Sequence, residues 1–396
     1  MPGDGPIWHK RKGHQVRKTI IAFMLGLLAA DAAAQSEDKL VIKPTGRVLM
    51  DAGLFDANEE NSKFNDGFAI PDLRVGVKAK YGKWGLKADV CYAYNKVGLK
   101  DVHIEYRFDG ENLLRGGYFV HHFGLQSGTS SSYKESMEEP MSNKAFFNSR
   151  LLGVMYAHTG KRWLATASVF SENDAMKMTT DKLGNQGVGA MTRQVYHPLT
   201  TPGRILHVGI SGAVESPRYN SDAEQNHRSF TLKATYPTRV AEITALEAGV
   251  TEAKTLYKFS PELLVAYGRW SVGGQYYYVG VKRRDGLPTW HGSGGYATLR
   301  ALIIGKPYAY NFEDGGLELP GKGSVEAVVS YDYTDMSCAK TGICGGRAND
   351  YSLTLNYYIN KYVTWRVRGS LTQVSGRAGY ADNCLRTLET RIQFKF

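Results

Sequence analysis

Basic side chains recur at every second position in several segments whose intervening positions are apolar. Alternate residues of a β-strand share one face, so this spacing would gather the cations on a common polar face. Such a surface concentrates anions, and a guanidinium group suits phosphate-like oxyanions. The basic residues of this face are Arg74, Lys78, Lys80, Lys87, Arg107, Lys233, Arg366, Arg368, Arg391 and Lys395.

Acidic residues occupy the same face and allow a second interpretation. The charges could pair with one another across an enclosed interior and only keep it hydrated. The acidic residues are Asp51, Asp89, Glu105, Glu326, Asp332 and Glu389.

The segment 122–148 is the best candidate for a loop that narrows a channel. It carries Lys134 and Lys144 but also three glutamates, which gives it a net charge of −1. A strong oxyanion site is not expected to be acidic. Either the two lysines face the channel while the glutamates face its wall, or selectivity is weak.

Catalysis and metal binding are disfavoured, although His121 and His122 precede a hydroxyl-rich stretch at 127–132. An outer-membrane hydrolase needs its histidine beside a nucleophile or a carboxylate. Adjacent strand residues point to opposite faces, so the two histidines are not expected to share a site. The cations form no stripe with stacking aromatics, and no phosphate-binding glycine motif occurs. We expect no catalytic residue, metal, cofactor or nucleic-acid partner.

Four cysteines leave several possibilities open. Cys338 and Cys344 are close in sequence and flanked by glycines, which is typical of a loop closed by a disulfide. Free thiols are an alternative. A metal site is the weakest interpretation, because no Cys-x-x-Cys motif accompanies them. The other two cysteines are Cys91 and Cys384.

The elements that carry these residues are predicted to be strands. In 73–81, for example, Leu73 and Val75 fall on one face while Arg74 and Lys78 fall on the other. Sixteen segments show this period: 43–53, 70–81, 84–94, 101–109, 113–121, 149–159, 163–171, 205–214, 228–236, 263–270, 273–281, 295–305, 323–333, 350–359, 362–373 and 386–396.

The predicted strands suit an antiparallel transmembrane barrel better than a soluble β-sandwich. Most have about the 9–11 residues that a tilted strand needs to cross a bilayer. Tight links alternate with long ones such as 122–148, 172–204, 237–262 and 334–349, although 215–227 and 306–322 are longer than this pattern prefers. Aromatic residues gather near the strand ends, as in the girdles of membrane barrels. The predicted fold is therefore all-β, a barrel of about sixteen strands with a long loop folded into the lumen.

The N-terminal residues 1–34 have the features of a secretory signal peptide. Five basic residues precede the apolar run 20–30, and three alanines precede Gln35. The full chain has 396 residues, a formal charge of +11 and a mean hydropathy of −0.34. This composition excludes a polytopic helical membrane protein. The barrel is predicted to occupy 35–396.

The mature chain resembles the phosphate-selective porin O and P family over nearly its whole length. The resemblance is carried by LKDVHIEY (99–106), GGYFVHHFGLQSGTSSS (116–132), NSRLLGVMY (148–156), LHVGISGAVESPRYN (206–220), GKPYAYN (305–311), GSVEAVVSYDYTDM (323–336), SLTLNYYINKYV (352–363) and TRIQFKF (390–396). It implies a usually trimeric barrel of sixteen strands in the outer membrane of a Gram-negative bacterium. It also implies that anions pass along arginine and lysine side chains.

The family's pattern is modified at several positions. Val120 stands where the family tends to have a lysine, and His122 where it has a proline. Glu139 replaces an arginine of the inserted loop, while Arg150 matches the family's arginine before a Gly-Val pair. These departures put strict phosphate selectivity in doubt.

The sequence thus predicts an outer-membrane porin for passive diffusion of small solutes, with a preference for anions such as phosphate. Its expected partners are membrane lipid, small anions and two further copies of the chain in a homotrimer. The alternatives are a non-conducting or non-selective barrel subunit of an outer-membrane complex and, less favoured, an outer-membrane hydrolase. The residues expected to line the pore are Arg74, Lys78, Lys87, Arg107, Lys134, Arg150, Arg366 and Arg368.

Overall fold

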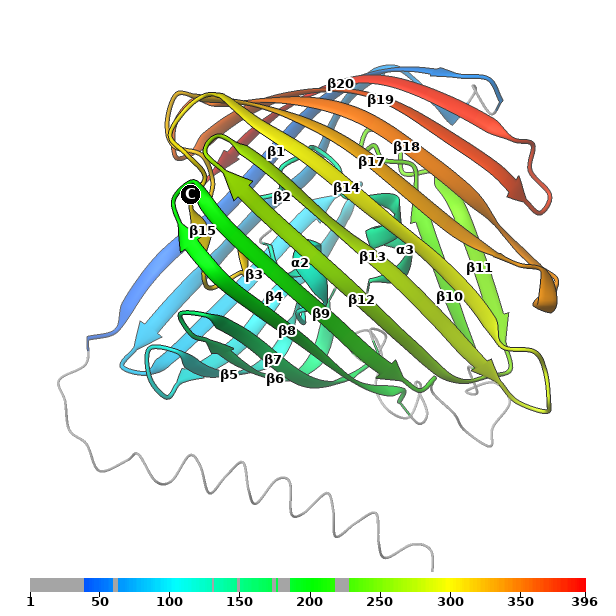
Figure 1. Cartoon of the computed structure of the whole chain (residues 1–396), viewed down its shortest axis with the longest axis horizontal. Helices are drawn as coiled ribbons and strands as arrows, with labels where there is room; N and C mark the ends of the chain where they lie inside the picture. Colours follow the sequence, from blue (N-terminus) through cyan, green and yellow to red (C-terminus); the bar gives the residue numbers. More distant parts are fainter. Residues whose placement is uncertain are drawn as a thin grey trace, which may run out of the picture. The chain divides into compact units, whose positions relative to one another are not determined.

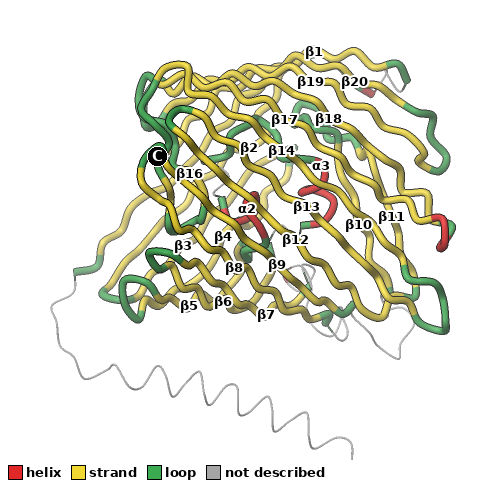
Figure 2. The backbone as a smooth tube through the Cα atoms, viewed as in Figure 1, coloured by secondary structure: helices red, strands yellow, loops and turns green. Residues whose placement is uncertain are grey.

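Sixteen antiparallel strands form one closed barrel in the computed structural model (Figures 1 and 2). The structure describes residues 39–59, 63–129, 132–147, 150–172, 176, 186–217 and 228–396, so the predicted signal peptide lies outside the described residues. The barrel strands in ring order are β1 (Val41–Ala57), β2 (Gly67–Tyr81), β3 (Trp84–Ala93), β4 (Lys96–Arg107), β5 (Asn112–Phe119), β6 (Leu151–Thr159), β7 (Trp163–Ser171), β8 (Val188–Thr201), β9 (Arg204–Glu215), β12 (Ala253–Tyr267), β13 (Trp270–Arg283), β14 (Trp290–Ile304), β17 (Ser324–Cys338), β18 (Ile343–Tyr358), β19 (Val363–Arg377) and β20 (Asn383–Lys395).

The first and last strands close the ring. β1 pairs with β20 from Arg47 opposite Lys395 to Ala57 opposite Leu385. The final residue extends this pairing, because Phe396 and Gly46 exchange two backbone hydrogen bonds of 3.0 Å. The barrel therefore has no unpaired edge, as a β structure in lipid requires.

The two faces of the barrel have the polarity of a membrane protein. Apolar side chains such as Val75, Ile210 and Leu353 are exposed on the outer face, whereas charged side chains such as Arg193 and Glu326 are buried on the inner face. Aromatic rings pack together beside the short turns, as with Trp84 and Tyr106 at 4.8 Å or Trp163 and Tyr196 at 4.7 Å. This is the outward apolar band and interfacial girdle of a transmembrane barrel.

One barrel strand was not predicted and one predicted strand lies outside the barrel, so the two errors cancel in the strand count. The segment 172–204 was expected to be a loop, but it contains β8, which joins β9 through a tight turn with Gly203 at φ 74°. The segment 228–236 was expected in the barrel, but it contains β10 (Ser229–Thr235), which forms a separate two-stranded sheet with β11 (Thr244–Thr251). β9 instead pairs directly with β12.

This correction also improves the alternation of short and long connections. Because β9 is the ninth barrel strand, the link 216–252 falls on the rim of long connections. The link 305–323 remains an exception, since it lies on the short-turn rim and forms a second small hairpin, β15 (Tyr310–Asn311) and β16 (Gly316–Leu317).

Two short helices lie in the connection between β5 and β6. They are α2 (Gly124–Gly128) and α3 (Met141–Phe146), and both appear within the ring of strands in Figure 1. α2 contacts β9, β12 and β13, and α3 contacts β13, β14 and β17. Among the described residues, no helix is long and apolar enough to cross a membrane.

The hairpin β10–β11 spans the interior of the barrel. On one side, Phe230 and Leu232 line a cavity together with Leu256 of β12. At the other side, Thr238 donates a hydrogen bond to Glu389 of β20 (2.6 Å), and β11 contacts β17, β18 and β19. β12 and β20 lie far apart in the ring, so the hairpin occupies much of the space between them.

The possible disulfide between Cys338 and Cys344 is not formed. Both are free thiols, as are Cys91 and Cys384. Cys338 lies opposite Ile343 in the register of β17 and β18, so Cys344 is displaced by one position from it. The short helix η3 (Ala339–Thr341) makes the turn between the two strands.

Candidate functional site

A set of accessible cations lies on the inner face from β2 to the start of β6. The side chains of Arg74 and Arg107 are 12% and 35% exposed, and Lys78 and Lys80 are more exposed than either. We call this set the basic wall. It comprises Arg74, Lys78, Lys80, Lys87, Arg107, Arg115 and Arg150.

Five carboxylates balance part of the basic wall. Asp72 pairs with Arg74 at 3.0 Å, Asp89 with Lys87 at 3.1 Å and Glu313 with Arg107 at 2.8 Å. Asp101 accepts a hydrogen bond from Nε of Arg150 (2.7 Å) and pairs with Lys87, while Glu105 pairs with Arg115 at 3.0 Å. Lys78 and Lys80 form no ion pair with any described residue. Five of the eight residues predicted to line a pore, Arg74, Lys78, Lys87, Arg107 and Arg150, lie together on this wall.

The remaining predicted cations are covered. Arg366 and Arg368 of β19 are each 2% exposed. Nη1 of Arg366 donates to the carbonyl oxygen of Ser136 (2.7 Å), and Nη1 of Arg368 donates to that of Pro237 (2.9 Å). Arg368 is further bound to Asp350 at 3.0 Å, so both guanidinium groups hold interior segments against the barrel. A pore-lining role for these two arginines stays a prediction.

Lys134 is also buried. Its Nζ donates to the carbonyl oxygen of Gln126 and to Oε1 of the same residue, the latter at 2.9 Å. Its ammonium group therefore joins two parts of its own segment instead of facing an open channel. A role of Lys134 in conduction stays a prediction.

The segment 120–147 connects opposite sides of the inner face. Near α2, the backbone nitrogen of Gly124 donates to the hydroxyl of Ser211 on β9 (2.9 Å). Further along, the carbonyl oxygen of Glu135 accepts from Asn356 of β18 (2.7 Å), and Ser142 of α3 binds Asp332 of β17. That this segment sets the narrowest point of a conducting pore stays a prediction.

Glu138 is the electrostatic centre of that segment. Its side chain is 1% exposed and forms ion pairs with Arg391 (2.8 Å), Lys144 (3.4 Å) and Arg239 (3.5 Å). Burial alone would raise the pKa of Glu138, but the neighbouring cations outweigh it and lower the pKa from 4.5 to about 2. The acidic charge that seemed unsuited to an anion channel is thus neutralised within the interior.

The lowered pKa of Glu138 predicts a specific acid sensitivity. The unfolded chain takes up this proton near pH 4.5, so the stabilisation is complete above that pH and is lost as the pH falls toward 2. We expect the free energy of unfolding of the Glu138→Gln variant to be roughly 3 kcal/mol lower than that of wild type at neutral pH. Denaturant titrations at several pH values should show this difference shrinking below pH 4.5. A difference that is independent of pH would contradict the assignment.

The sequence did not indicate a buried cluster around Glu262 of β12. Arg193 of β8 binds this carboxylate at 2.7 Å, as does Nε2 of His207 from β9. Nδ1 of His207 lies 2.8 Å from the hydroxyl of Tyr310 in β15. Arg193 also donates to the carbonyl oxygen of Gly315 (2.9 Å), so the cluster fastens the β15–β16 hairpin to the inner face.

Of the two histidines considered for catalysis, His121 is engaged in packing. Nε2 of His121 lies 3.3 Å from the carbonyl oxygen of Leu151, and its ring stacks on Phe119 at 4.2 Å. The Ser127 hydroxyl accepts from the backbone nitrogen of Phe123 (2.6 Å). Within the described part of the chain, no three His, Cys, Asp or Glu residues are grouped as a metal site.

Solved structures of outer-membrane proteins share this architecture. OmpT of Vibrio cholerae matches with a TM-score of 0.59 and 10% identity, covering 91% of this chain and 99% of its own. The anion-selective porin from Comamonas acidovorans matches with a TM-score of 0.57 and 11% identity, covering 90% of this chain and 100% of its own. The channel DcaP of Acinetobacter baumannii gives a TM-score of 0.55 at 11% identity, covering 92% of this chain and 100% of its own. At these identities the likeness shows the fold.

Sequence comparison identifies the family. No curated protein matches the sequence. The family model for phosphate-selective porin O and P matches residues 42–396, which is the whole barrel. The chain therefore belongs to the phosphate-selective porin O and P family and is an outer-membrane β-barrel of a Gram-negative bacterium.

Proposed function

We propose that this porin passes small solutes by passive diffusion and prefers anions, including oxyanions such as phosphate. The observation that carries the proposal is the basic wall, where seven cations stand against the five carboxylates that pair with them, and where Lys78 and Lys80 form no ion pair with any described residue. A passage bounded on one side by excess positive charge raises the local concentration of anions and lowers that of cations. The similar porin from Comamonas acidovorans is described as anion-selective.

The partly exposed guanidinium groups of the basic wall support the oxyanion part of the proposal. They belong to Arg74, Arg107, Arg115 and Arg150. Guanidinium groups bind oxyanions through paired hydrogen bonds. We further propose a homotrimer, as reported for one form of the similar OmpT.

Charge reversal at Lys78 and Lys80 tests the anion preference. Both are exposed on the basic wall and unpaired with any described residue, so the Lys78→Glu/Lys80→Glu variant should keep the fold. We expect its zero-current potential under a KCl gradient to shift toward cation selectivity. The Lys161→Glu/Arg162→Glu variant carries the same charge change at the turn between β6 and β7 and should shift it much less. Equal shifts would mean that the basic wall does not set selectivity.

A non-conducting barrel subunit is the second candidate. It is favoured by the segment 120–147 and the β10–β11 hairpin, both of which cross the interior. Absence of any conductance in reconstituted wild-type protein would favour this candidate over the porin.

A further inference from the structure

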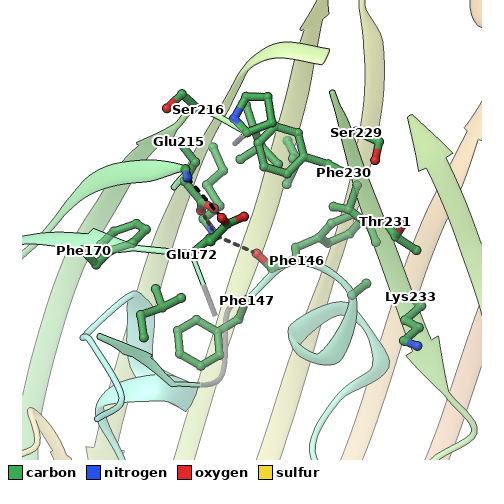
Figure 3. Close-up of a pocket in the computed structure, with 18 of the residues that line it drawn as sticks. Phe146, Phe147, Phe170, Glu172, Glu215, Ser216, Ser229, Phe230, Thr231 and Lys233 are labelled. Atoms are coloured by element: carbon green, nitrogen blue, oxygen red, sulfur yellow. Dashed lines mark hydrogen bonds and ion pairs between the residues drawn. The ribbon is translucent and has the colours of Figure 1, made fainter. Parts of the chain in front are cut away.

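A cavity of about 480 Å³ lies beside the β10–β11 hairpin, toward the rim of long connections (Figure 3). Its wall is formed by the ends of β7, β8, β9 and β12, by the end of α3 and by β10. This volume falls within the range of about 300–1,000 Å³ that is typical of small-molecule sites.

Four phenylalanines give the cavity an aromatic lining. Phe146 and Phe147 come from the end of α3, Phe170 from β7 and Phe230 from β10 (Figure 3). Leu232 and Leu256 add aliphatic surface. These rings, which come from three separate parts of the chain, favour a ligand with an aromatic ring, since aromatic groups attract one another in offset or edge-to-face contacts.

Several charged residues that line the cavity already form ion pairs or hydrogen bonds within the protein. Lys258 pairs with Glu215 at 2.9 Å and donates to the carbonyl oxygen of Phe146 (3.2 Å), so these two charges neutralise each other. Lys144 lies 3.4 Å from Glu138. The carboxylate of Glu172 accepts from the backbone nitrogen of Gly187 (3.2 Å).

Lys233 of β10 also lines the cavity and forms no ion pair or hydrogen bond with any described residue, but Arg150 is the lining cation whose guanidinium offers two such donors side by side. Its Nε donates to Asp101 (2.7 Å), but its two Nη nitrogens make no hydrogen bond to any described residue. Its side chain is 15% exposed and lines the cavity. A guanidinium edge with two donors matches the two oxygens of a carboxylate.

We propose that this cavity binds an aromatic carboxylate, with its ring among the phenylalanines and its carboxylate on the Nη edge of Arg150. An inorganic anion would leave the aromatic lining unused, and a neutral aromatic would leave the guanidinium edge without an acceptor.

The position of Arg150 connects the cavity to the proposed conduction path. Arg150 and Lys87 share the carboxylate of Asp101, so the cavity and the basic wall meet at this residue. A carboxylate released from Arg150 faces the cations of β3 and β5 next. The inference rests on the proposed function, because it takes the bound acid to be a solute that the porin passes. It deepens that function by naming the class of this solute.

Equilibrium binding of 2-naphthoate to the full-length mature porin in detergent tests the site. Isothermal titration, corrected by a titration into micelles alone, should show one saturable site per chain. The uncharged 2-naphthylmethanol should bind at least about tenfold more weakly, since it cannot make the charge-assisted bonds. Inorganic phosphate should compete much more weakly than a second aromatic acid, because it can bind the guanidinium of Arg150 but makes no use of the phenylalanine rings.

Two pairs of variants locate the binding. Arg150→Gln and Phe230→Ala should each weaken naphthoate binding about tenfold or more. Their controls, Arg347→Gln and Phe312→Ala, change the same residue types at positions that do not line the cavity, and they should leave it unchanged. Each variant is folded if its unheated sample has the electrophoretic mobility of the wild-type barrel. The milder Phe230→Leu replaces Phe230→Ala if that variant fails to fold.

The outcomes separate this inference from the proposed function. Heat no greater than in the micelle blank, or equal affinities in all four variants, overturns the aromatic-acid site even if the porin conducts anions normally. Saturable binding that depends on Arg150 and Phe230 supports the site even if bilayers show no anion preference, in which case the proposed function alone fails.

Discussion

Removing the β10–β11 hairpin should raise the single-channel conductance severalfold. The register of β9 and β12 ends at Glu215 opposite Leu256, and its continuation would place Ser216 opposite Thr255, so an Asn-Gly turn can join these two residues in place of residues 217–254. The barrel wall stays complete, because β9 and β12 already pair directly. The expected gain follows from the wider cross-section left by a hairpin that extends from β12 to Glu389 of β20.

The control for this deletion shortens the exposed connection 378–382 between β19 and β20. It removes residues at the same rim while leaving the interior segments in place. Planar-bilayer recordings in concentrated KCl should show a large increase for the first variant and little change for the second. A conductance that does not rise without the hairpin would show that ions pass elsewhere in the interior.

Replacing Glu262 by glutamine should lower the free energy of unfolding by about 3–5 kcal/mol. Its carboxylate, Arg193 and His207 are fully buried, and removing one charge leaves the guanidinium without its counter-charge. Denaturant titration of the reconstituted barrel measures the loss. The β15–β16 hairpin should loosen as well, since Tyr310 reaches the carboxylate through His207.

Two further variants define the origin of that loss. The double variant Glu262→Leu/Arg193→Met removes both charges and should recover much of the stability. Breaking the exposed pair of Arg386 and Asp56 by Asp56→Ala should cost less than about 1 kcal/mol. Equal costs for Glu262→Gln and Asp56→Ala would contradict the buried-pair explanation.

The alternation of apolar and polar residues was sufficient to predict a sixteen-stranded barrel but not which segments build it. β8 was not predicted because polar and apolar residues do not alternate cleanly along it. Its outward face carries the polar Thr192 and Gln194, while its inward face buries the apolar Met191 and Val195. The β10 segment alternates clearly, yet a hairpin with one apolar face inside the barrel has the same period of two as a wall strand.

The candidate site was predictable where local pattern determines it. The cations of β2, β3 and β4 face inward as their spacing predicted, whereas Arg115 was missed because the glycines that follow it weaken the pattern. The burial of Arg366 and Arg368 depends on Ser136 and Pro237, which are distant in sequence. Reversing these arginines therefore tests folding rather than selectivity.

The pairing of β1 with β20 has a consequence for how the chain acquires its structure. Asp51 and Arg391 are 340 positions apart in the sequence yet bind each other on adjacent strands. The ring cannot close until the last strand has been synthesised, so every earlier intermediate presents two open edges that can pair with other chains. Such distant contacts make barrel formation slow and leave the unfinished chain dependent on protection from aggregation.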